Sequence, residues 1–328
     1  MRALVLWTSV MAVWAGDRPK PPLGLPPLEW PGNNRYSAAK AELGRYLYFD
    51  PRLSVDGTVA CATCHDPRYA FADGAPVSTG VGAQTGSRNA PSIINRGYAA
   101  AQFWDGRAQS LEEQALGPLG NPREMGGSRE AAVARLAAIA GYRPLFGKAF
   151  GSEEIDIRRV AMAIACFERT VLSGNAPFDR YRHGEKSAMT PAQVRGMAVF
   201  FAKAKCDHCH EGPNFTMNTY ANLGIGTEKP DPDVGRYAIT KDPRDWGVFK
   251  VPALREVEHT APSMHDGSLR TLREVVEFYD RGGIPNRNLD PSIRPLHLTE
   301  GEKADLVEFL KALSGEGWQE VRAPERLP

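Results

Sequence analysis

The chain has 328 residues, which is enough for one large domain or two of ordinary size. Its 40 Lys and Arg residues against 39 Asp and Glu residues leave a net charge of +1, so nothing supports a nucleic-acid-binding protein. A composition of 42% apolar and 24% charged residues excludes a disordered chain.

The N-terminus has the pattern of an export signal. Arg2 supplies the positive start, residues 3–14 form an apolar run, and the sequence at 13–15 ends in a small residue suited to cleavage. The run is too short to span a bilayer, so we expect no transmembrane segment; a buried N-terminal helix is the alternative. We predict a signal peptide at residues 1–15, an N-terminal arm at residues 16–35 and a periplasmic protein.

Two copies of a Cys-x-x-Cys-His motif define the class of the protein. They read CATCH at residues 61–65 and CDHCH at residues 206–210. This motif attaches haem c through two thiols, and its histidine is the proximal iron ligand. A zinc site made from both motifs and a redox-active thiol pair are the alternatives, although a thiol pair does not need the histidine. The predicted haem-binding residues are Cys61, Cys64, His65, Cys206, Cys209 and His210. The fifth cysteine, Cys166, lies in an apolar helical run and is predicted to be a buried structural thiol.

The remaining chain predicts a mainly α fold with long irregular loops. Ser110 with Glu113 and two Thr–Glu pairs have the spacing of helix-capping boxes, whereas alternating strand patterns are scarce. The predicted helices cover residues 37–47, 110–116, 128–140, 156–172, 190 to the second motif, 271–282 and 299–313.

The two halves of the chain match each other. Pro91 precedes the Asp105–Gly106 turn by 14 residues, and Pro252 precedes the equivalent turn at Asp266 by the same number. Repeats of this kind indicate duplicated structural units. We therefore expect two cytochrome-c-like haem domains related by an internal repeat, at residues 36–180 and 181–328.

The repeat predicts different ligands for the two irons. Tyr279 lies 13 residues after Asp266, and its repeat equivalent after Asp105 is Pro118. If the helix after each turn carries the distal ligand, haem 2 receives a tyrosine and haem 1 faces a proline, which has no donor atom. Haem 1 would then be open to a small oxidant, while haem 2 would be an electron store. The alternative is that Tyr279 is a core aromatic beside Phe278.

Several longer motifs resemble the bacterial dihaem cytochrome c peroxidase and MauG family. They read RNAP at 88–91, QFWDGR at 102–107, FKVPALR at 249–255 and TAP at 260–262, and the similarity covers nearly the whole mature chain. The chain is similar to the MauG branch, because Val81 stands where other members have a distal histidine and Tyr279 stands where they have a methionine. The resemblance implies that Tyr279 binds the haem 2 iron, whereas Met264 matches a position that is not a ligand.

The resemblance also implies roles for residues around the haems. Trp104 would lie between the haems, and Gln114 and Glu124 would be polar residues of the peroxide pocket, with Pro118 beside them. Because Gln114 and Pro118 are four residues apart, they share a helix face. A calcium ion would be bound by Asn89, Thr260 and Pro262, the last two through backbone carbonyls. Taken singly, each residue is also explained by packing, a surface charge or a turn.

Three functions remain as hypotheses. The first is an enzyme that uses hydrogen peroxide at haem 1, with Glu124 moving a proton and Gln114 hydrogen-bonding the oxidant, to oxidise a tryptophan of a partner protein. The second is a peroxidase that removes peroxide with electrons from a small cytochrome c or a cupredoxin. The third is a non-enzymatic dihaem electron carrier. Ala204 stands where MauG has a surface tryptophan, which favours MbnH-like relatives; Trp246 is another possible route to a substrate.

Overall fold

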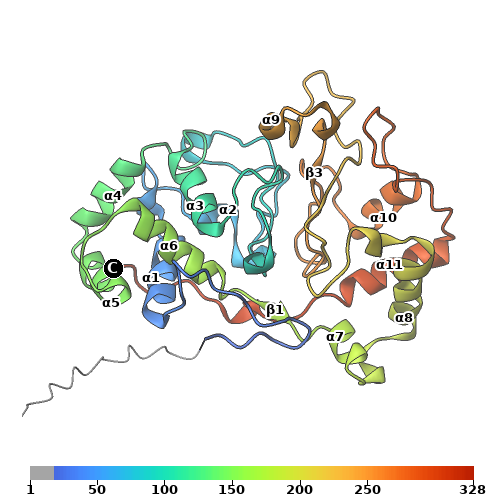
Figure 1. The fold of residues 1–328 in the computed structure, drawn as a ribbon, viewed down its shortest axis with the longest axis horizontal. Coiled ribbons are helices and arrows are strands. Elements are labelled where there is room, and N and C mark those ends of the chain that lie inside the picture. Colours follow the sequence, from blue (N-terminus) through green and yellow to red (C-terminus); the bar gives the residue numbers. More distant parts are fainter. Residues whose placement is uncertain (1–17) are drawn as a thin grey trace, which may run out of the picture.

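The computed structural model describes residues 18–328 and is mainly helical (Figure 1). The predicted signal peptide at residues 1–15 lies outside the described residues. Across residues 18–328, no helix has both the length and the apolar character needed to cross a membrane. The α-helices are α1 (Ala38–Phe49), α2 (Cys61–Cys64), α3 (Leu111–Gly120), α4 (Arg129–Ala138), α5 (Tyr142–Phe150), α6 (Ile157–Glu168), α7 (Pro177–Arg182), α8 (Pro191–Ala198), α9 (Tyr237–Thr240), α10 (Leu272–Asp280) and α11 (Glu300–Lys311).

The strands are short and form two antiparallel pairs. One pair joins β1 (Ser173–Gly174) to β4 (Glu316–Gly317), and the other joins β2 (Tyr220–Ala221) to β3 (Phe249–Lys250). The rest of the described chain consists of loops and short 3₁₀ turns. The fold is therefore held by helix packing, and its loops are free to line sites.

Two hydrophobic cores divide the helices into two units. The first core lies among α1, α3, α4, α5 and α6, and the second lies among α8, α10 and α11. In the first, α1 crosses α6 at Gly44, where a Cβ would overlap the carbonyl oxygen of Ala163. In the second, α8 crosses α11 at Gly196, which meets the carbonyl oxygen of Asp305 in the same way. Glycine therefore permits the closest helix approach in each unit.

The loops between the units repeat the same geometry. An isolated bridge joins Gln102 to Ala108, and a second joins Ser263 to Leu269, each residue 161 positions after its counterpart. Across the junction, the Asn89 amide donates to the carbonyl of His265, and the Lys250 amide donates to that of Trp104, both at 2.7 Å. Asn89 and Lys250 are 161 positions apart, and so are Trp104 and His265. Each unit therefore makes the same contact with the other, which means that the two units are related by an approximate twofold axis.

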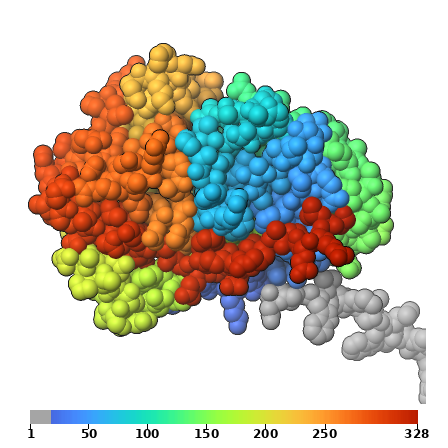
Figure 2. All heavy atoms as spheres, turned by 180° about the vertical axis from the view of Figure 1, so that it is seen from behind, coloured from blue at the N-terminus to red at the C-terminus, as the bar shows by residue number. Residues whose placement is uncertain are grey.

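The C-terminal segment ties the units together (Figure 2). After α11 the chain returns through β4 to the first unit, where Trp318 and Val321 pack against the first core. Arg52 donates to the carbonyl oxygen of Pro328 at 3.0 Å. At the other end of the chain, Asn175 donates its backbone amide to Leu23 at 2.7 Å, which fastens the N-terminal arm.

The helix caps agree with the sequence, with two differences. Thr271 and Thr299 form complete capping boxes. Ser110 accepts from the Glu113 amide, but the Glu113 carboxylate accepts from Gln109, so this box is incomplete. Helix α3 also continues past the predicted end near residue 116 to residue 120, with Pro118 in its last turn. A proline is tolerated there because only one backbone hydrogen bond is lost at the end of the helix.

We expect Gly44→Ala to destabilise the protein, because the added methyl group would force α1 away from α6. Overpacking of this kind typically costs about 1–3 kcal/mol. Gly301→Ala in α11 is the matched control, since its Cβ would meet nothing closer than 4.0 Å and alanine favours helix by about 1 kcal/mol. Chemical unfolding of the haem-loaded protein, followed by far-UV circular dichroism, measures both; equal unfolding midpoints for the two variants would contradict the prediction.

Candidate functional site

The first Cys-x-x-Cys-His motif forms one wall of a cavity of about 420 Å³. This volume is within the range of small-molecule and cofactor sites. The cavity brings together all the residues predicted for the first haem and its peroxide pocket: Cys61, Cys64, His65, Trp104, Gln114, Pro118 and Glu124.

Local hydrogen bonds set the geometry of this motif. The His65 amide donates to the carbonyl of Cys61 at 3.0 Å, and the Tyr48 hydroxyl donates to the carbonyl of His65 at 2.8 Å. Burial raises the pKa of Cys64 to about 11 and lowers the pKa of His65. A neutral imidazole is the form that binds a metal, and all five cysteines are free of disulfides. The donor set therefore fits a covalently attached haem.

The opposite wall of the cavity comes from α3 and the loop after it. Gln114 and Pro118 both reach the cavity from α3, as their four-residue spacing predicts. Glu124 accepts a hydrogen bond from the Asn121 side chain at 2.7 Å, and its backbone carbonyl accepts from the Val81 amide at 3.0 Å. Burial raises the pKa of Glu124, against the opposing effects of Asn121 and the positive charge of Arg107. The cavity thus holds a carboxyl group that keeps its proton to a higher pH than an exposed glutamate does, as suits a group that exchanges protons.

Some cavity residues were not identified from the sequence. Arg107 lies flat on the Phe103 ring at 3.5 Å and donates to both oxygens of Asp105. Glu168, on α6, is 5% exposed, and its Oε2 has no hydrogen-bond partner in the described part of the chain. Burial raises the pKa of Glu168 to about 8. Asp105 and Arg107 belong to a recognised motif, but Glu168 follows a run of apolar residues and has no local signal.

The second motif follows the π-helical turn Val199–Lys203. The His210 amide donates to Cys206 at 2.9 Å, and Nδ1 of His210 lies 3.0 Å from the carbonyl oxygen of Phe215. Burial lowers the pKa of His210 to about 4 and raises that of Cys206 to about 12. These free, buried donors match those of the first motif, so a second covalent haem fits here.

Tyr279, on α10, lies close to this second motif. Burial raises the pKa of Tyr279, and its nearness to the Cys206 and Cys209 side chains raises it further. These thiols are therefore within electrostatic range of the phenol. Phe278, the neighbouring residue, is buried at 4% exposed, and its ring meets that of Tyr279 edge-on at 5.7 Å. Of these two aromatic side chains, Tyr279 is the one beside the motif.

Trp104 lies where the two units meet. Its indole nitrogen donates to the carbonyl of Asn89 at 2.8 Å, and its ring is 6.5 Å from that of His265 in an edge-on arrangement. Phe249 stacks on the other side of His265 at 3.6 Å. Aromatic side chains therefore run from the first cavity into the junction.

The predicted calcium ligands come from both sides of the same junction. The hydrogen bond between the Asn89 amide and His265 holds Asn89 against the loop that carries Thr260 and Pro262. The side-chain nitrogen of Asn89 donates to the carbonyl oxygen of Ala75 at 2.9 Å. The side-chain oxygen of Asn89 takes no part in this hydrogen bond, so it is the atom that an ion would contact. Within residues 18–328, no three His, Cys, Asp or Glu side chains gather as a metal site. An ion here would depend on amide and carbonyl oxygens, and a zinc site shared by the two motifs has no support.

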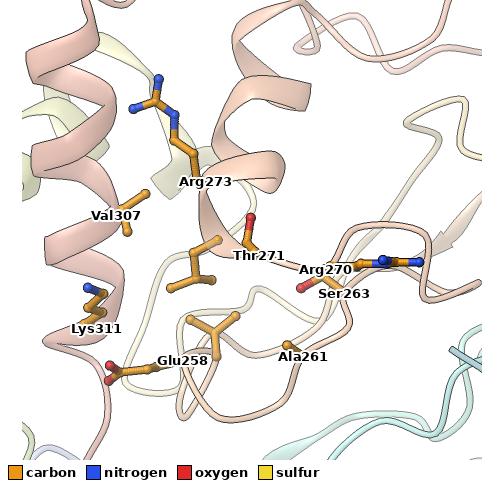
Figure 3. A pocket seen from close by; sticks show the side chains of 10 residues that line it. Glu258, Ala261, Ser263, Arg270, Thr271, Arg273, Val307 and Lys311 are labelled. Atoms are coloured by element: carbon orange, nitrogen blue, oxygen red, sulfur yellow. The ribbon is translucent and has the colours of Figure 1, made fainter. Parts of the chain in front are cut away.

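A second cavity, of about 340 Å³, lies between α10, α11 and the loop at 257–263 (Figure 3). Thr271 and Arg273 line it from α10, and Val307 and Lys311 line it from α11. None of the predicted site residues lines this cavity.

Comparisons with known proteins point to one family. Residues 38–187 match the family described as di-haem cytochrome c peroxidase. The chain is 42% identical to the methylamine utilization protein MauG of Methylorubrum extorquens, over 87% of this chain and 81% of that protein. It is 38% identical to the cytochrome-c peroxidase IdrP1 of Pseudomonas sp. strain SCT, over 90% and 86% of the two chains. Among solved structures, it is similar to a MauG-like protein associated with microbial copper homeostasis, with a TM-score of 0.84, 36% identity and coverage of 93% and 96%.

Proposed function

Because the chain belongs to the family of MauG and the di-haem cytochrome c peroxidases, we propose that it uses hydrogen peroxide to oxidise a tryptophan of a partner protein. The chain is a peroxidase-type oxidoreductase, since its relatives are di-haem enzymes of this kind. The observation that carries the proposal is the difference between its two sites. Pro118 faces the first motif across the cavity, whereas Tyr279 lies beside the second motif.

In this proposal the first cavity receives peroxide. The haem held by Cys61, Cys64 and His65 supplies an iron that takes electrons from donors and passes them to peroxide. Pro118 offers no ligand atom and so leaves room for the oxidant. Glu124 transfers a proton between the two peroxide oxygens, and Gln114 orients the oxidant by hydrogen bonding. The pKa of Glu124, raised by burial, suits that role.

The second site stores the oxidising equivalents. Cys206, Cys209 and His210 would hold the second haem, and Tyr279 would supply a phenolate oxygen to its iron. An anionic phenolate donates more charge to iron than a thioether does, so it favours a higher oxidation state. Trp104 couples the two sites through the aromatic groups at the junction.

The proposal includes the setting of the enzyme. Each haem belongs to its own cytochrome-c-like domain, at residues 36–180 and 181–328. Residues 1–15 direct the chain to the periplasm, where haem c is attached. A calcium ion bound by Asn89, Thr260 and Pro262 braces the junction, since oxygen donors of this kind suit calcium.

A second candidate function is removal of peroxide with electrons from a small cytochrome c or a cupredoxin. It is supported by the similarity to a cytochrome-c peroxidase at 38% identity. The non-enzymatic carrier is set aside, because the family relatives are enzymes.

One experiment separates the two candidates. We expect one equivalent of peroxide, added to the fully oxidised protein, to abolish the ferric EPR signals of both haems without a prior reduction step. Optical and EPR spectra before and after addition measure this. A protein that reacts only after one-electron reduction would instead be a donor-dependent peroxidase. If the fully oxidised protein reacts directly, mass spectrometry of co-purifying proteins incubated with peroxide identifies the oxidised tryptophan.

A further inference from the structure

Two cations at the junction of the units, one half-buried and the other buried, have no acidic partner. They are Arg96, in the loop before Trp104, and Lys250, in β3. Throughout residues 18–328, every ion pair at the junction involves other residues, such as Arg88 with Asp105 and Asp233. Burying a charge without a counter-charge is strongly unfavourable, so an anion is expected between the units.

Arg96 is directed at the first haem site. It lines the cavity that holds His65, and its guanidinium donates to the neutral oxygens of Gln102 and Ala101, at 2.5 to 3.2 Å. Its positive charge contributes to lowering the pKa of His65. Burial lowers the pKa of Arg96 itself to about 10.

Lys250 lies on the side of the second site, although its equivalent in the repeat is Asn89 and not Arg96. It is 5% exposed, and its backbone amide is fixed on the carbonyl of Trp104 at 2.7 Å. Its positive charge contributes to lowering the pKa of His210. Burial, followed by the charge of Arg96, lowers the pKa of Lys250 to about 6. The charge of Arg96 thus disfavours the charged form of Lys250. With a pKa of about 6, Lys250 keeps its proton at neutral pH only if an anion lies beside it.

The chain does not supply that anion from nearby acids. Glu168 is the acid whose charge acts on Arg96, and the two form no hydrogen bond or ion pair in the described residues. Asp105 and Asp233 are already bound by Arg88. The negative charge must therefore come from a bound molecule that carries carboxylates and is present at both haem sites.

We propose that Arg96 and Lys250 bind the propionate carboxylates of the haems, Arg96 those of haem 1 and Lys250 those of haem 2. Each haem carries two propionates, so the anions arrive with the cofactors themselves. The arrangement turns the propionate edges of both haems toward the junction that contains Trp104. It also raises the reduction potential of each haem, because a nearby positive charge disfavours the more positively charged ferric iron.

The test replaces each cation by a neutral side chain and measures the haems one by one. Lys250→Met keeps the length of the side chain and removes the charge, and Lys250→Arg is the matched control that keeps the charge. Spectroelectrochemical titration gives the midpoint potential of each haem, and resonance Raman spectroscopy reports propionate hydrogen bonding. We expect Lys250→Met to lower the potential of haem 2 more than that of haem 1 and to shift its propionate bending band. Lys250→Arg should stay near the wild type.

Arg96→Gln is an independent test, and its effect should fall on the other haem. We expect it to lower the reduction potential of haem 1 more than that of haem 2. Haem content from the pyridine haemochrome assay shows whether both haems are attached. If the charge-removing variants carry both haems and leave both potentials and both Raman bands unchanged, the proposal is overturned. The same holds if both variants act on the same haem. None of these measurements uses peroxide or a protein substrate, so they remain valid if the proposed oxidation of tryptophan fails.

Discussion

Exchange of Tyr279 for histidine is expected to leave both haems attached but to shorten the life of the oxidised state that peroxide produces. Burial and the neighbouring thiols raise the pKa of Tyr279, so the phenol loses its proton there only if a cation such as iron takes its place. A neutral imidazole would donate less charge to that iron. A loss of about 1.4 kcal/mol of stabilisation corresponds to a tenfold change, and we expect at least roughly this change in lifetime. Stopped-flow absorption after one equivalent of peroxide measures it.

Tyr279→Phe distinguishes a ligand from a core aromatic side chain. This variant keeps the ring and removes only the hydroxyl group. If Tyr279 binds iron, the EPR and optical spectra of haem 2 change in the resting protein. If the ring is only a buried aromatic group, as that of Phe278 is, the spectra stay as in the wild type. An unchanged lifetime in Tyr279→His together with unchanged spectra in Tyr279→Phe would falsify the role that we propose for this residue.

Replacement of Glu124 by glutamine is expected to slow the reaction with peroxide by roughly 10²–10⁴-fold, the usual contribution of a general acid–base group. Glutamine has nearly the same shape and can still bond Asn121, so the cavity should persist. Burial raises the pKa of Glu124, which means that the carboxyl keeps its proton to a higher pH than an exposed glutamate does. The wild-type rate should therefore fall on acidification through that raised pKa, and the variant should lose this dependence.

The rate of peroxide reaction across a pH series, measured by stopped flow, tests both statements. Glu130→Gln is the matched control, because Glu130 is exposed at the start of α4 and does not line the cavity. It should react at the wild-type rate. A wild-type rate and pH profile in Glu124→Gln would assign proton transfer to another group, and Glu168 in the same cavity would be the next to examine.

Much of the candidate site could be predicted because its signals are local. The thiols and histidine of each haem motif must be adjacent in the chain, since they bind one cofactor edge and one iron. The helix caps at Thr271 and Thr299 are equally local and were predicted correctly. The repeat added longer-range information, because it aligned Pro118 with Tyr279 before any contact was known.

Other features depend on which distant segments meet, and only the tertiary structure decided them. Arg96 and Lys250 look like ordinary surface cations in the sequence, and only their place at the junction, half-buried and buried, shows that they need a counter-charge. In the sequence, Glu168 is simply the end of an apolar helical segment, and only the folded structure shows that it lines the first cavity. The return of the C-terminal segment to the first core, at Trp318, likewise has no local signal. The sequence alone thus determined the class of cofactor, the helices and the internal repeat. Haem attachment motifs and helix caps depend on residues that are close together in the chain, and a repeat is visible by comparing the two halves. The environment of each charged side chain was decided by packing between the two units, because burial and electric fields depend on all segments at once.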